Sequence, residues 1–387
     1  MAFTLDKYRE RIAESQKRLE ITRHFREPDR VPILISTGGS FYCSLFGYDI
    51  ADYYSDLEVT LKVQLKGLEW AYEELQDDRA GAGLHPEIGP VAEAILFNAP
   101  IKRPRGTSPW GKHIIHDLVD IDRLQVPDPA THPGVQWVYS RVDEMRALAE
   151  KRGETLPVSG GFGIHPPLSA ACAITEPALI FEWMITEPAQ IRKLFDKLFE
   201  AFCRCVDYGD HRHARIERAS TVGLTDDRKA PSQRESIGLA DDHSAFVSDA
   251  LYREMVLPYN LAIYERYGKR GRTFHADGPN DHHFATYANL LKLTQMDVGG
   301  FSDIANAKRE LYGKTVMSGG LNCKDLYYDF ETARPAVERA IRIGAPGGGY
   351  ILAVGGETYA GVNPDTLIKT VAYAKEIGGY PIRGVEQ

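Results

Sequence analysis

The sequence predicts an α/β protein whose parallel strands close into a (β/α)8 barrel. Short apolar runs alternate with amphipathic segments over most of the 387 residues, and this alternation is typical of parallel sheets covered by helices. The tally comes to about eight strand–helix units, which suits a closed barrel better than an open sheet. No Gly-x-Gly-x-x-Gly follows a predicted strand and opens a helix, so a dinucleotide-binding fold is not indicated.

The predicted strands are apolar runs that end at turn residues or at charged side chains. The first one, Val-Pro-Ile-Leu-Ile-Ser at residues 31–36, follows a break at Glu-Pro-Asp-Arg and stops at Thr-Gly-Gly. Residues 79–118 contain another strand and a hairpin-like excursion, in which residues 94–97 are β-prone. The other strands are predicted at residues 156–163, 236–240, 271–275, 293–298, 315–318 and 350–354.

Helices are predicted where apolar residues recur at helical spacing. The first covers residues 6–25 and forms an N-terminal helical extension within residues 1–30. Residues 210–235 are polar and irregular, and we expect a loop or lid there, within a single domain of residues 1–387. The remaining helices are predicted at residues 57–75, 135–151, 177–183, 188–207, 249–267, 281–291, 305–312, 332–343 and 363–377.

The composition is that of a soluble globular protein, with 43% hydrophobic and 26% charged residues. A net charge of −8 gives no basic field to attract nucleic acid or anionic lipid, so neither is an expected partner. No apolar run reaches the roughly 18 residues of a membrane span, and residues 1–30 lack the apolar core of a signal peptide. The five cysteines show no paired spacing, which argues against a disulfide framework. We therefore expect a cytoplasmic protein.

Acidic and imidazole side chains follow two consecutive predicted strands. Asp241, Asp242 and His243 come directly after one strand, and His275 and Asp277 lie at the end of the next. The carboxyl ends of parallel strands meet at one face of a barrel, where active sites form. A carboxylate at a strand end can instead cap the following helix, and this alternative stays open for each residue alone. Several of them lie too far from a helix start to be caps, so we expect one shared site.

His275 and Asp277 are two residues apart, so on an extended segment their side chains point to the same side. Such a pair can bind a metal ion or act as a histidine–carboxylate acid–base pair, and both interpretations stay open. Asn322 and Glu357 follow later strands and add polar groups to the same predicted face.

Aromatic residues near strand ends predict an apolar substrate pocket. Phe41 and Tyr42 follow the first strand, Phe162 lies at the end of another, and Tyr359 follows the last. Together with Asn322, these are the predicted substrate-binding residues. Trp183 is compatible both with this pocket and with core packing, so it is not assigned to substrate binding.

Several stretches of the chain carry a resemblance to a known family. They read Glu-Pro-Asp-Arg-Val-Pro at 27–32, Gly-Leu-Ala-Asp-Asp-His at 238–243, Ser-Asp-Ala-Leu-Tyr-Arg-Glu-Met-Val-Leu-Pro-Tyr at 248–259, Phe-His-Ala-Asp-Gly at 274–278, and Gly-Tyr-Ile-Leu-Ala-Val-Gly-Gly at 349–356. With these motifs the sequence resembles the uroporphyrinogen decarboxylase superfamily over nearly its whole length. The resemblance implies a (β/α)8 barrel, in agreement with the strand count.

Two branches of this superfamily differ in their site residues. Porphyrinogen decarboxylases carry an arginine-rich segment after the first strand that grips substrate carboxylates, but residues 36–43 contain no arginine. The chain is more similar to the corrinoid-dependent methyltransferases, and closest to their O-demethylase-like members. Zinc-binding members of that branch use His-x-Cys and a late cysteine, where this sequence has His275-Ala276-Asp277 and Glu357. The resemblance thus implies an oxygen-rich zinc site of His275, Asp277 and Glu357.

The resemblance implies a methyltransferase of the O-demethylase type. Such an enzyme removes a methyl group from a methylated small molecule, here expected to be a methyl ether, and passes it to a corrinoid on a partner protein. The predicted catalytic residues are Asp241, Asp242, His243 and His275. Two alternatives remain: a decarboxylase or lyase of a small carboxylic acid, and a barrel that binds a small ligand without turnover. A homodimer is compatible with the resemblance.

Overall fold

The computed structural model describes residues 3–219 and 234–382, which form two compact units. The first unit consists of Met1–Glu87, Met145–Ser159 and Thr273–Gln387, and the second consists of Ile88–Glu144 and Gly160–Arg272. The two units are therefore interleaved in the sequence rather than successive. The single domain expected for residues 1–387 stays a prediction.

A parallel sheet dominates the first unit, with its strands in the order β1-β8-β7-β6-β5. Main-chain pairing continues beyond β1 through extended segments, because Asp78 N donates to Ile33 O at 2.8 Å and Leu84 pairs in parallel with Val158. The parallel alternation of strands and helices confirms the α/β class. The strands are β1 (Ile33–Leu34), β5 (Gly271–His275), β6 (Gln295–Val298), β7 (Val316–Leu321) and β8 (Tyr350–Val354).

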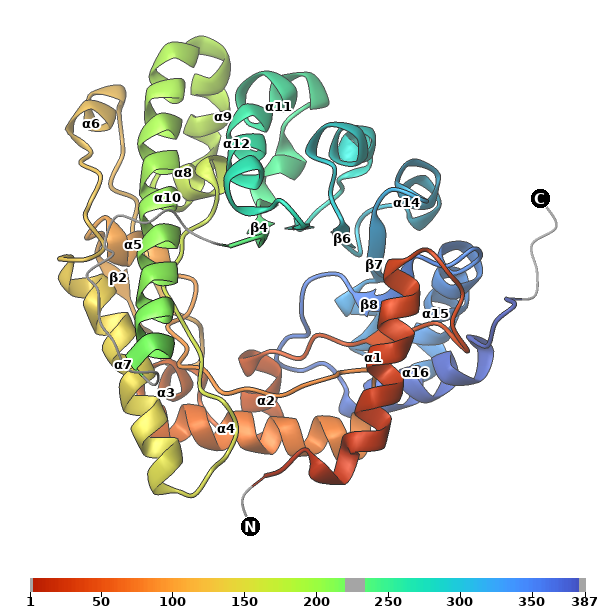
Figure 1. Cartoon of the computed structure of the whole chain (residues 1–387). Helices are drawn as coiled ribbons and strands as arrows, with labels where there is room; N and C mark the ends of the chain where they lie inside the picture. The colour runs from red at the N-terminus through yellow and green to blue at the C-terminus, as the bar shows by residue number, and fades with distance from the viewer. Residues whose placement is uncertain (1–2, 220–233, 383–387) are drawn as a thin grey trace. The chain divides into compact units, whose positions relative to one another are not determined.

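Helices of the first unit pack on this sheet and on one another. Leu19 of the N-terminal helix α1 packs against Val316 of β7 and Ile351 of β8, and α15 lies beside α16 (Figure 1). Asp49 and Asp56 begin α3 and α4 as N-caps. The helices are α1 (Arg9–Arg23), α2 (Gly39–Phe46), α3 (Ile50–Ser55), α4 (Leu57–Trp70), α13 (Phe284–Thr286), α14 (Ile304–Leu311), α15 (Phe330–Gly344) and α16 (Pro364–Ile377), with short 3₁₀ or π segments η1 (Asp6–Tyr8), η2 (Ala71–Leu75), η4 (Asp281–His283), η5 (Tyr287–Leu291) and η6 (Cys323–Leu326).

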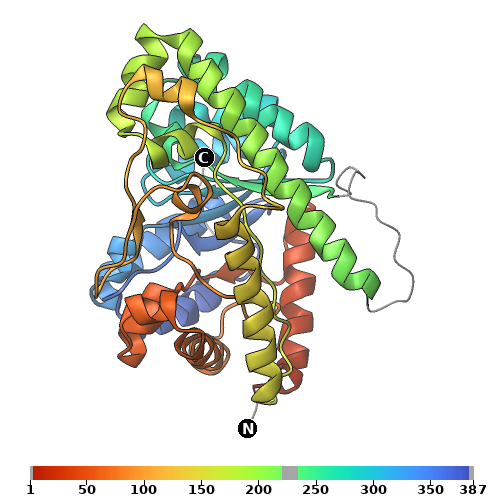
Figure 2. The same ribbon diagram turned by 90° about the vertical axis from the view of Figure 1, so that its left-hand side faces the viewer.

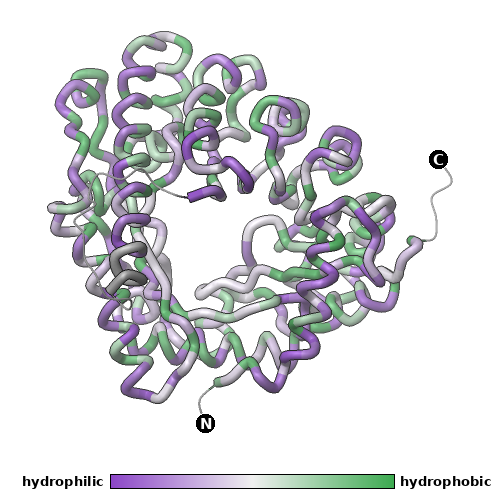
Figure 3. Tube along the Cα trace, viewed as in Figure 1, coloured by the Kyte–Doolittle hydropathy of each residue, from purple (hydrophilic) through white to green (hydrophobic). Residues whose placement is uncertain are grey.

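The second unit is mainly helical. Its strand β4 lies beside the start of β5, where the amides of Arg270 and Gly271 donate to the carbonyl of Glu235. The long green helix α10 stands out in Figures 1 and 2, and its trace in Figure 3 alternates between hydrophobic and hydrophilic residues. The elements are α5 (Ala92–Leu96), an antiparallel hairpin of β2 (Ile101–Lys102) and β3 (Trp110–Gly111), α6 (Leu118–Arg123), α8 (Pro167–Ile174), α9 (Pro177–Thr186), α10 (Pro188–Ala219), β4 (Ser236–Ala240), η3 (Asp242–Phe246), α11 (Asp249–Met255) and α12 (Leu257–Tyr267); α7 (Pro133–Lys151) continues from the second unit into the first.

Some local predictions differ from the structure. Residues 94–97 were expected to be extended, but most of them belong to helix α5, because a short apolar run does not distinguish a buried strand from a buried helix. The loop or lid predicted at 210–235 is wrong for residues 210–219, which continue α10. Arg212 in this stretch pairs with Asp143 of α7, so its side chain links two helices. Residues 220–233 of that prediction lie outside the described residues.

No helix in the described ranges, 3–219 and 234–382, is both long enough and apolar enough to cross a membrane.

Candidate active site

The ring of His275, the last residue of β5, is held by the neighbouring strand. Asp297 lies on β6, which pairs with β5, and its Oδ2 accepts a hydrogen bond from Nδ1 of His275 at 2.8 Å. The backbone N of Gly356, which follows β8, donates to the same oxygen at 3.0 Å. A carboxylate only accepts hydrogen bonds, so Nδ1 of His275 carries the proton and Nε2 is the nitrogen able to bind a metal or accept a proton.

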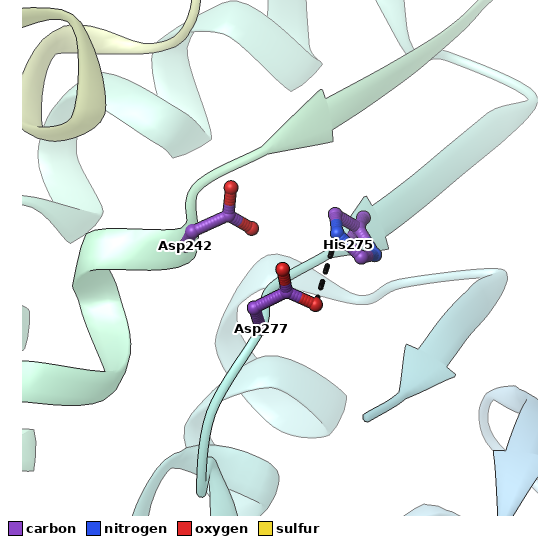
Figure 4. Close-up of side chains that lie close together, drawn as sticks. All are labelled: Asp242, His275 and Asp277. Carbon is purple, nitrogen blue, oxygen red and sulfur yellow. Dashed lines mark ion pairs between the residues drawn. The ribbon is translucent and has the colours of Figure 1, made fainter. Parts of the chain in front are cut away.

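Asp277 stands next to this second nitrogen. Its Oδ1 lies 3.6 Å from Nε2 of His275, so the two side chains lie together as their spacing predicts (Figure 4). A Cβ at Gly356, whose φ is +75°, would lie 3.2 Å from Oδ1 of Asp277. Glycine therefore leaves room beside the pair. Figure 4 also draws Asp242, which follows β4 and belongs to the second unit.

The chemistry of this donor set fits zinc. Zinc accepts imidazole nitrogen and carboxylate oxygen as ligands. A metal-binding histidine usually donates its other N–H to a carboxylate, which fixes the tautomer and raises the basicity of the ligand. Asp297 does this for His275. Within the first unit, His275 through Nε2 and Asp277 through its carboxylate could therefore hold a zinc ion, with Asp297 as their support.

Glu357, the third predicted metal ligand, follows β8 and packs against Gly38. A Cβ at Gly38 would overlap the Glu357 carboxylate. Burial raises the pKa of Glu357, and the carboxylates of Glu87 and Asp277 raise it further, while His275 acts in the opposite direction. Glu357 therefore lies within electrostatic reach of the His275–Asp277 pair, and its role as a ligand stays a prediction.

The first unit holds another histidine–carboxylate pair, which the sequence analysis missed. Nε2 of His85 lies 2.7 Å from Oε1 of Glu87, and this hydrogen bond raises the pKa of His85. Gln64 fixes the His85 backbone, accepting from its N at 3.0 Å and donating to its O at 2.7 Å. The signal in the sequence was the same two-residue spacing as in His275 and Asp277.

A fully buried carboxylate, Asp241, follows β4 in the second unit. Its side chain is 0% exposed, and it accepts hydrogen bonds from Ser169 Oγ at 2.8 Å and from Asn260 Nδ2 at 2.9 Å. Burial raises the pKa of Asp241 to about 6, although the hydrogen bonds from Asn260 and Ser169 act in the opposite direction. Because Asp241 is enclosed, a proton that it holds can reach a substrate only through a neighbouring group.

Ser169, on α8, is that neighbour, and it connects Asp241 to His243. Its Oγ lies 3.2 Å from Nδ1 of His243 and accepts from the His243 backbone N at 3.3 Å. Burial lowers the pKa of His243, so its ring is neutral at neutral pH. If a proton moved from Asp241 through Ser169 to His243, the Ser169 hydroxyl would donate to His243 instead of Asp241, and the His243 ring would change its tautomer. Asp242, half-buried, precedes His243 at the start of η3.

Glu93 and His165 form a further pair in the second unit that the sequence analysis did not identify. Oε1 of Glu93 lies 2.7 Å from the backbone N and 2.8 Å from Nδ1 of His165. Burial alone would raise the pKa of Glu93 and lower that of His165, but their mutual hydrogen bonds reverse both directions. The two residues are 72 positions apart and Glu93 sits in an apolar run, so no spacing signals the pair.

The predicted substrate contacts have different environments. Phe41 and Tyr42 are buried in the first unit, where both rings lie against Trp70, and Phe162 is buried in the second unit. Tyr359, in contrast, is 50% exposed. Asn322 is 8% exposed, and its side chain caps η6 by accepting from Lys324 N at 3.0 Å. Their assignment to substrate binding stays a prediction.

The sequence assigns Trp183 neither to the substrate pocket nor to the core. Trp183 lies on α9 and is 9% exposed, so its side chain is mainly packed in the interior of the second unit.

Comparison with known proteins identifies the family. Residues 14–209 and 232–377 match the sequence profile of the family described as "Uroporphyrinogen decarboxylase (URO-D)". Among solved structures, a methyltransferase from Methanosarcina mazei is similar, with a TM-score of 0.65 and 14% sequence identity over 94% of this chain and 98% of that chain. A search of curated protein sequences finds no significant match. The structural likeness concerns the fold and agrees with the predicted (β/α)8 class, and the family match spans most of the sequence. This chain belongs to the uroporphyrinogen decarboxylase family.

Proposed function

We propose that this protein is a methyltransferase that removes a methyl group from a methylated small molecule, a methyl ether, and passes it to a corrinoid on a partner protein. Family membership and the likeness to a methyltransferase support this proposal. The stretch after β1 supports it as well, because residues 36–43 contain no arginine that could hold the carboxylates of a porphyrinogen.

The observation that carries the proposal is the arrangement of His275. Its Nδ1 faces Asp297, and its Nε2 stands beside the Asp277 carboxylate. His275 and Asp277 would hold zinc, with Glu357 as the proposed third ligand, and the ion would supply Lewis acidity at the ether oxygen. A set with carboxylates in place of thiolates is a harder donor set, which suits an oxygen substrate.

Cleavage of a methyl ether also requires a proton for the oxygen that loses the methyl group. The groups proposed for this task are Asp241, Asp242 and His243, which follow β4, and, if no metal is bound, His275. Asp241 is enclosed, so in this proposal it acts through Ser169 on His243 rather than on the substrate. Proton transfer by positioned groups of this kind typically contributes about 10²–10⁴-fold in rate.

The test is methyl transfer to free cob(I)alamin. The purified protein, supplied with zinc, is incubated with cob(I)alamin and a panel of aryl and alkyl methyl ethers, and methylcobalamin and the released alcohol are quantified together. We expect equal amounts of both from at least one ether. His275→Gln should reduce the rate by at least 10²-fold, whereas the matched variant His116→Gln, at an exposed position, should leave it unchanged. Absence of methylcobalamin with every ether contradicts the proposal.

A carboxy-lyase is the second candidate, and the family name and Asp241 favour it. With a pKa of about 6, Asp241 is partly protonated near neutral pH and could feed a proton through Ser169 to a carbanion left by CO₂ loss. Release of CO₂ from small carboxylic acids, measured on the same protein sample, separates this activity from methyl transfer.

A further inference from the structure

The Glu93–His165 pair has the construction of a fixed proton donor. Glu93 is 2% exposed on α5, and a buried carboxylate is costly unless it is paired and hydrogen-bonded. Its Oε1 lies within hydrogen-bond distance of both the backbone N and Nδ1 of His165. Two hydrogen bonds from one residue fix the position of the ring as well as its orientation.

The side chain of His165 is only partly buried, whereas its partner is enclosed. Its side chain is 37% exposed, while its partner Glu93 is only 3% exposed. Since Glu93 is an ionised acceptor, Nδ1 of His165 must donate to it, and the second nitrogen, Nε2, is the one that can meet a substrate. The hydrogen bond to Glu93 therefore occupies Nδ1 and leaves Nε2 as the nitrogen assigned to the chemistry.

The charged groups around His165 favour its protonated form. Besides Glu93, the carboxylates of Asp241 and Asp242 act on it and raise its pKa, against the effect of burial. His243, the other imidazole nearby, is held on Ser169, and burial lowers its pKa. Of these two neighbouring imidazoles, His165 has a raised pKa and His243 a lowered pKa. A separation of this kind is how acid and base roles are divided between two groups of the same type.

We propose that His165 is the general acid of the reaction, with Glu93 as its positioning residue and His243 as a neutral hydrogen-bond acceptor. This inference rests on the proposed function and gives His165 the proton-donor task that was assigned there to Asp241 acting through Ser169 on His243. As the C–O bond of the methyl ether breaks, the methyl group leaves to the cobalt(I) acceptor, which supplies the electron pair for the new bond. The electron pair of the broken bond stays on oxygen, and this oxygen takes the proton from Nε2 of His165. His165 is left neutral and regains its proton from water.

The kinetic test compares two aryl methyl ethers whose leaving phenols differ in acidity, anisole and 4-nitroanisole. An acidic leaving group needs little protonation, so it depends less on a general acid. We expect His165→Gln to lower kcat by about 10²–10⁴-fold for anisole and by less than about 10-fold for 4-nitroanisole. Glu93→Gln should lower kcat with little change in KM. It should also move the basic limb of the pH–rate profile, which reports loss of the acid's proton, to lower pH. The matched control His116→Gln should change neither ether.

A second readout does not depend on turnover. The protein is labelled with ¹⁵N-histidine, and the His165 ring signals are assigned by their loss in His165→Gln. We expect His165 to titrate above the ordinary histidine range in the wild-type protein and at lower pH in Glu93→Gln. Circular dichroism and thermal melting confirm that each variant is folded.

The possible results separate this inference from the proposed function. No turnover of either ether by the wild-type protein counts against methyl transfer itself. Turnover with an equal loss for both ethers in His165→Gln overturns the general-acid role while leaving methyl transfer intact. A His165 ring that is neutral at all pH values above 6 overturns it as well, whatever the turnover.

Discussion

At the residue scale, the carboxylates of Asp297 and Glu93 each define the role of one histidine. Nδ1 of His275 faces Asp297 and Nδ1 of His165 faces Glu93, at 2.8 Å in both cases. In each pair Nε2 becomes the nitrogen available for chemistry. The two histidines differ in their other neighbours. Asp277 Oδ1 lies 3.6 Å from Nε2 of His275, and this pairing of imidazole and carboxylate suits a metal ion. The role proposed for His165 is proton donation, which requires no metal ion.

The support that Asp297 gives to His275 can be tested by zinc affinity. Asp297→Asn keeps the size of the side chain but removes the charge that orients the His275 ring. We expect zinc to bind about 10–100-fold more weakly, because outer-shell partners of metal-binding histidines have effects of this size. Competition with a chromophoric chelator measures the change. Asp6→Asn, at a side chain 74% exposed, is the matched control and should bind zinc as the wild type does. Equal affinities for Asp297→Asn and wild type contradict the support.

The pKa of Asp241 makes a prediction about stability and pH. Folding raises this pKa from 3.8 to about 6, so the folded state holds the proton more tightly than the unfolded state. Stability therefore falls as pH rises from about 4 to about 6, and the full penalty remains above that range. Between pH 4.5 and pH 7 the wild type should lose about 2 kcal/mol relative to Asp241→Asn, which cannot ionise. Urea unfolding of both proteins at the two pH values gives this difference. A constant difference would mean that Asp241 titrates normally.

At the scale of elements, the sequence predicts the bounds of several strands well, because each is a short apolar run that ends at polar or turn residues. The bounds of β5 and β8 agree residue by residue with the predicted 271–275 and 350–354, as do those of β4 in the second unit. Short apolar helices such as α2 and α8 were not predicted, because runs this short have no distinct period. Two residues of the candidate site were missed as a result, because Ser169 lies on α8 and Glu93 lies on α5. Contacts between distant elements, unlike strand ends, have no local signal.

The loop after β1 tests whether Glu357 contributes to the metal site. A methyl group at Gly38 would overlap the Glu357 carboxylate, which must then move. If Glu357 is a zinc ligand, Gly38→Ala should weaken zinc binding by at least about 10-fold, since one of three protein ligands is displaced. Gly81→Ala is the matched control, because a Cβ there meets no described atom within 4 Å. Unchanged zinc affinity in Gly38→Ala would remove Glu357 from the proposed ligand set.

At the scale of the whole molecule, family and fold class could be read from the sequence, whereas the assembly of the site could not. Motifs spread from residue 27 to residue 356 indicated the family, and the match over residues 14–209 and 232–377 confirms it. Of the candidate site, the His275–Asp277 pair followed from its spacing. The Glu93–His165 pair has no such signal, because its partners are 72 positions apart and long-range packing brings them together. The His85–Glu87 pair has the same two-residue spacing and was missed.

Zinc should also stabilise the folded protein as a whole. A ligand that binds only the folded state at 100 times its Kd adds about 2.7 kcal/mol, which corresponds to a Tm increase of about 3 °C for a chain of this size. Removing metal with a chelator should therefore lower the Tm of the wild type by about this amount. His275→Gln should show no such shift, and a shift of equal size in that variant would place the metal elsewhere.

The most direct measurement of the central claim follows the methyl group itself. A methyl ether labelled with ¹³C in its methyl group is mixed with cob(I)alamin and an excess of enzyme, and NMR spectroscopy follows the label through a single turnover. The account predicts that the label moves to cobalt, giving ¹³C-methylcobalamin in an amount equal to the demethylated alcohol. Labelled methanol, or label that stays on the ether while CO₂ is released from a carboxylic acid, would contradict methyl transfer.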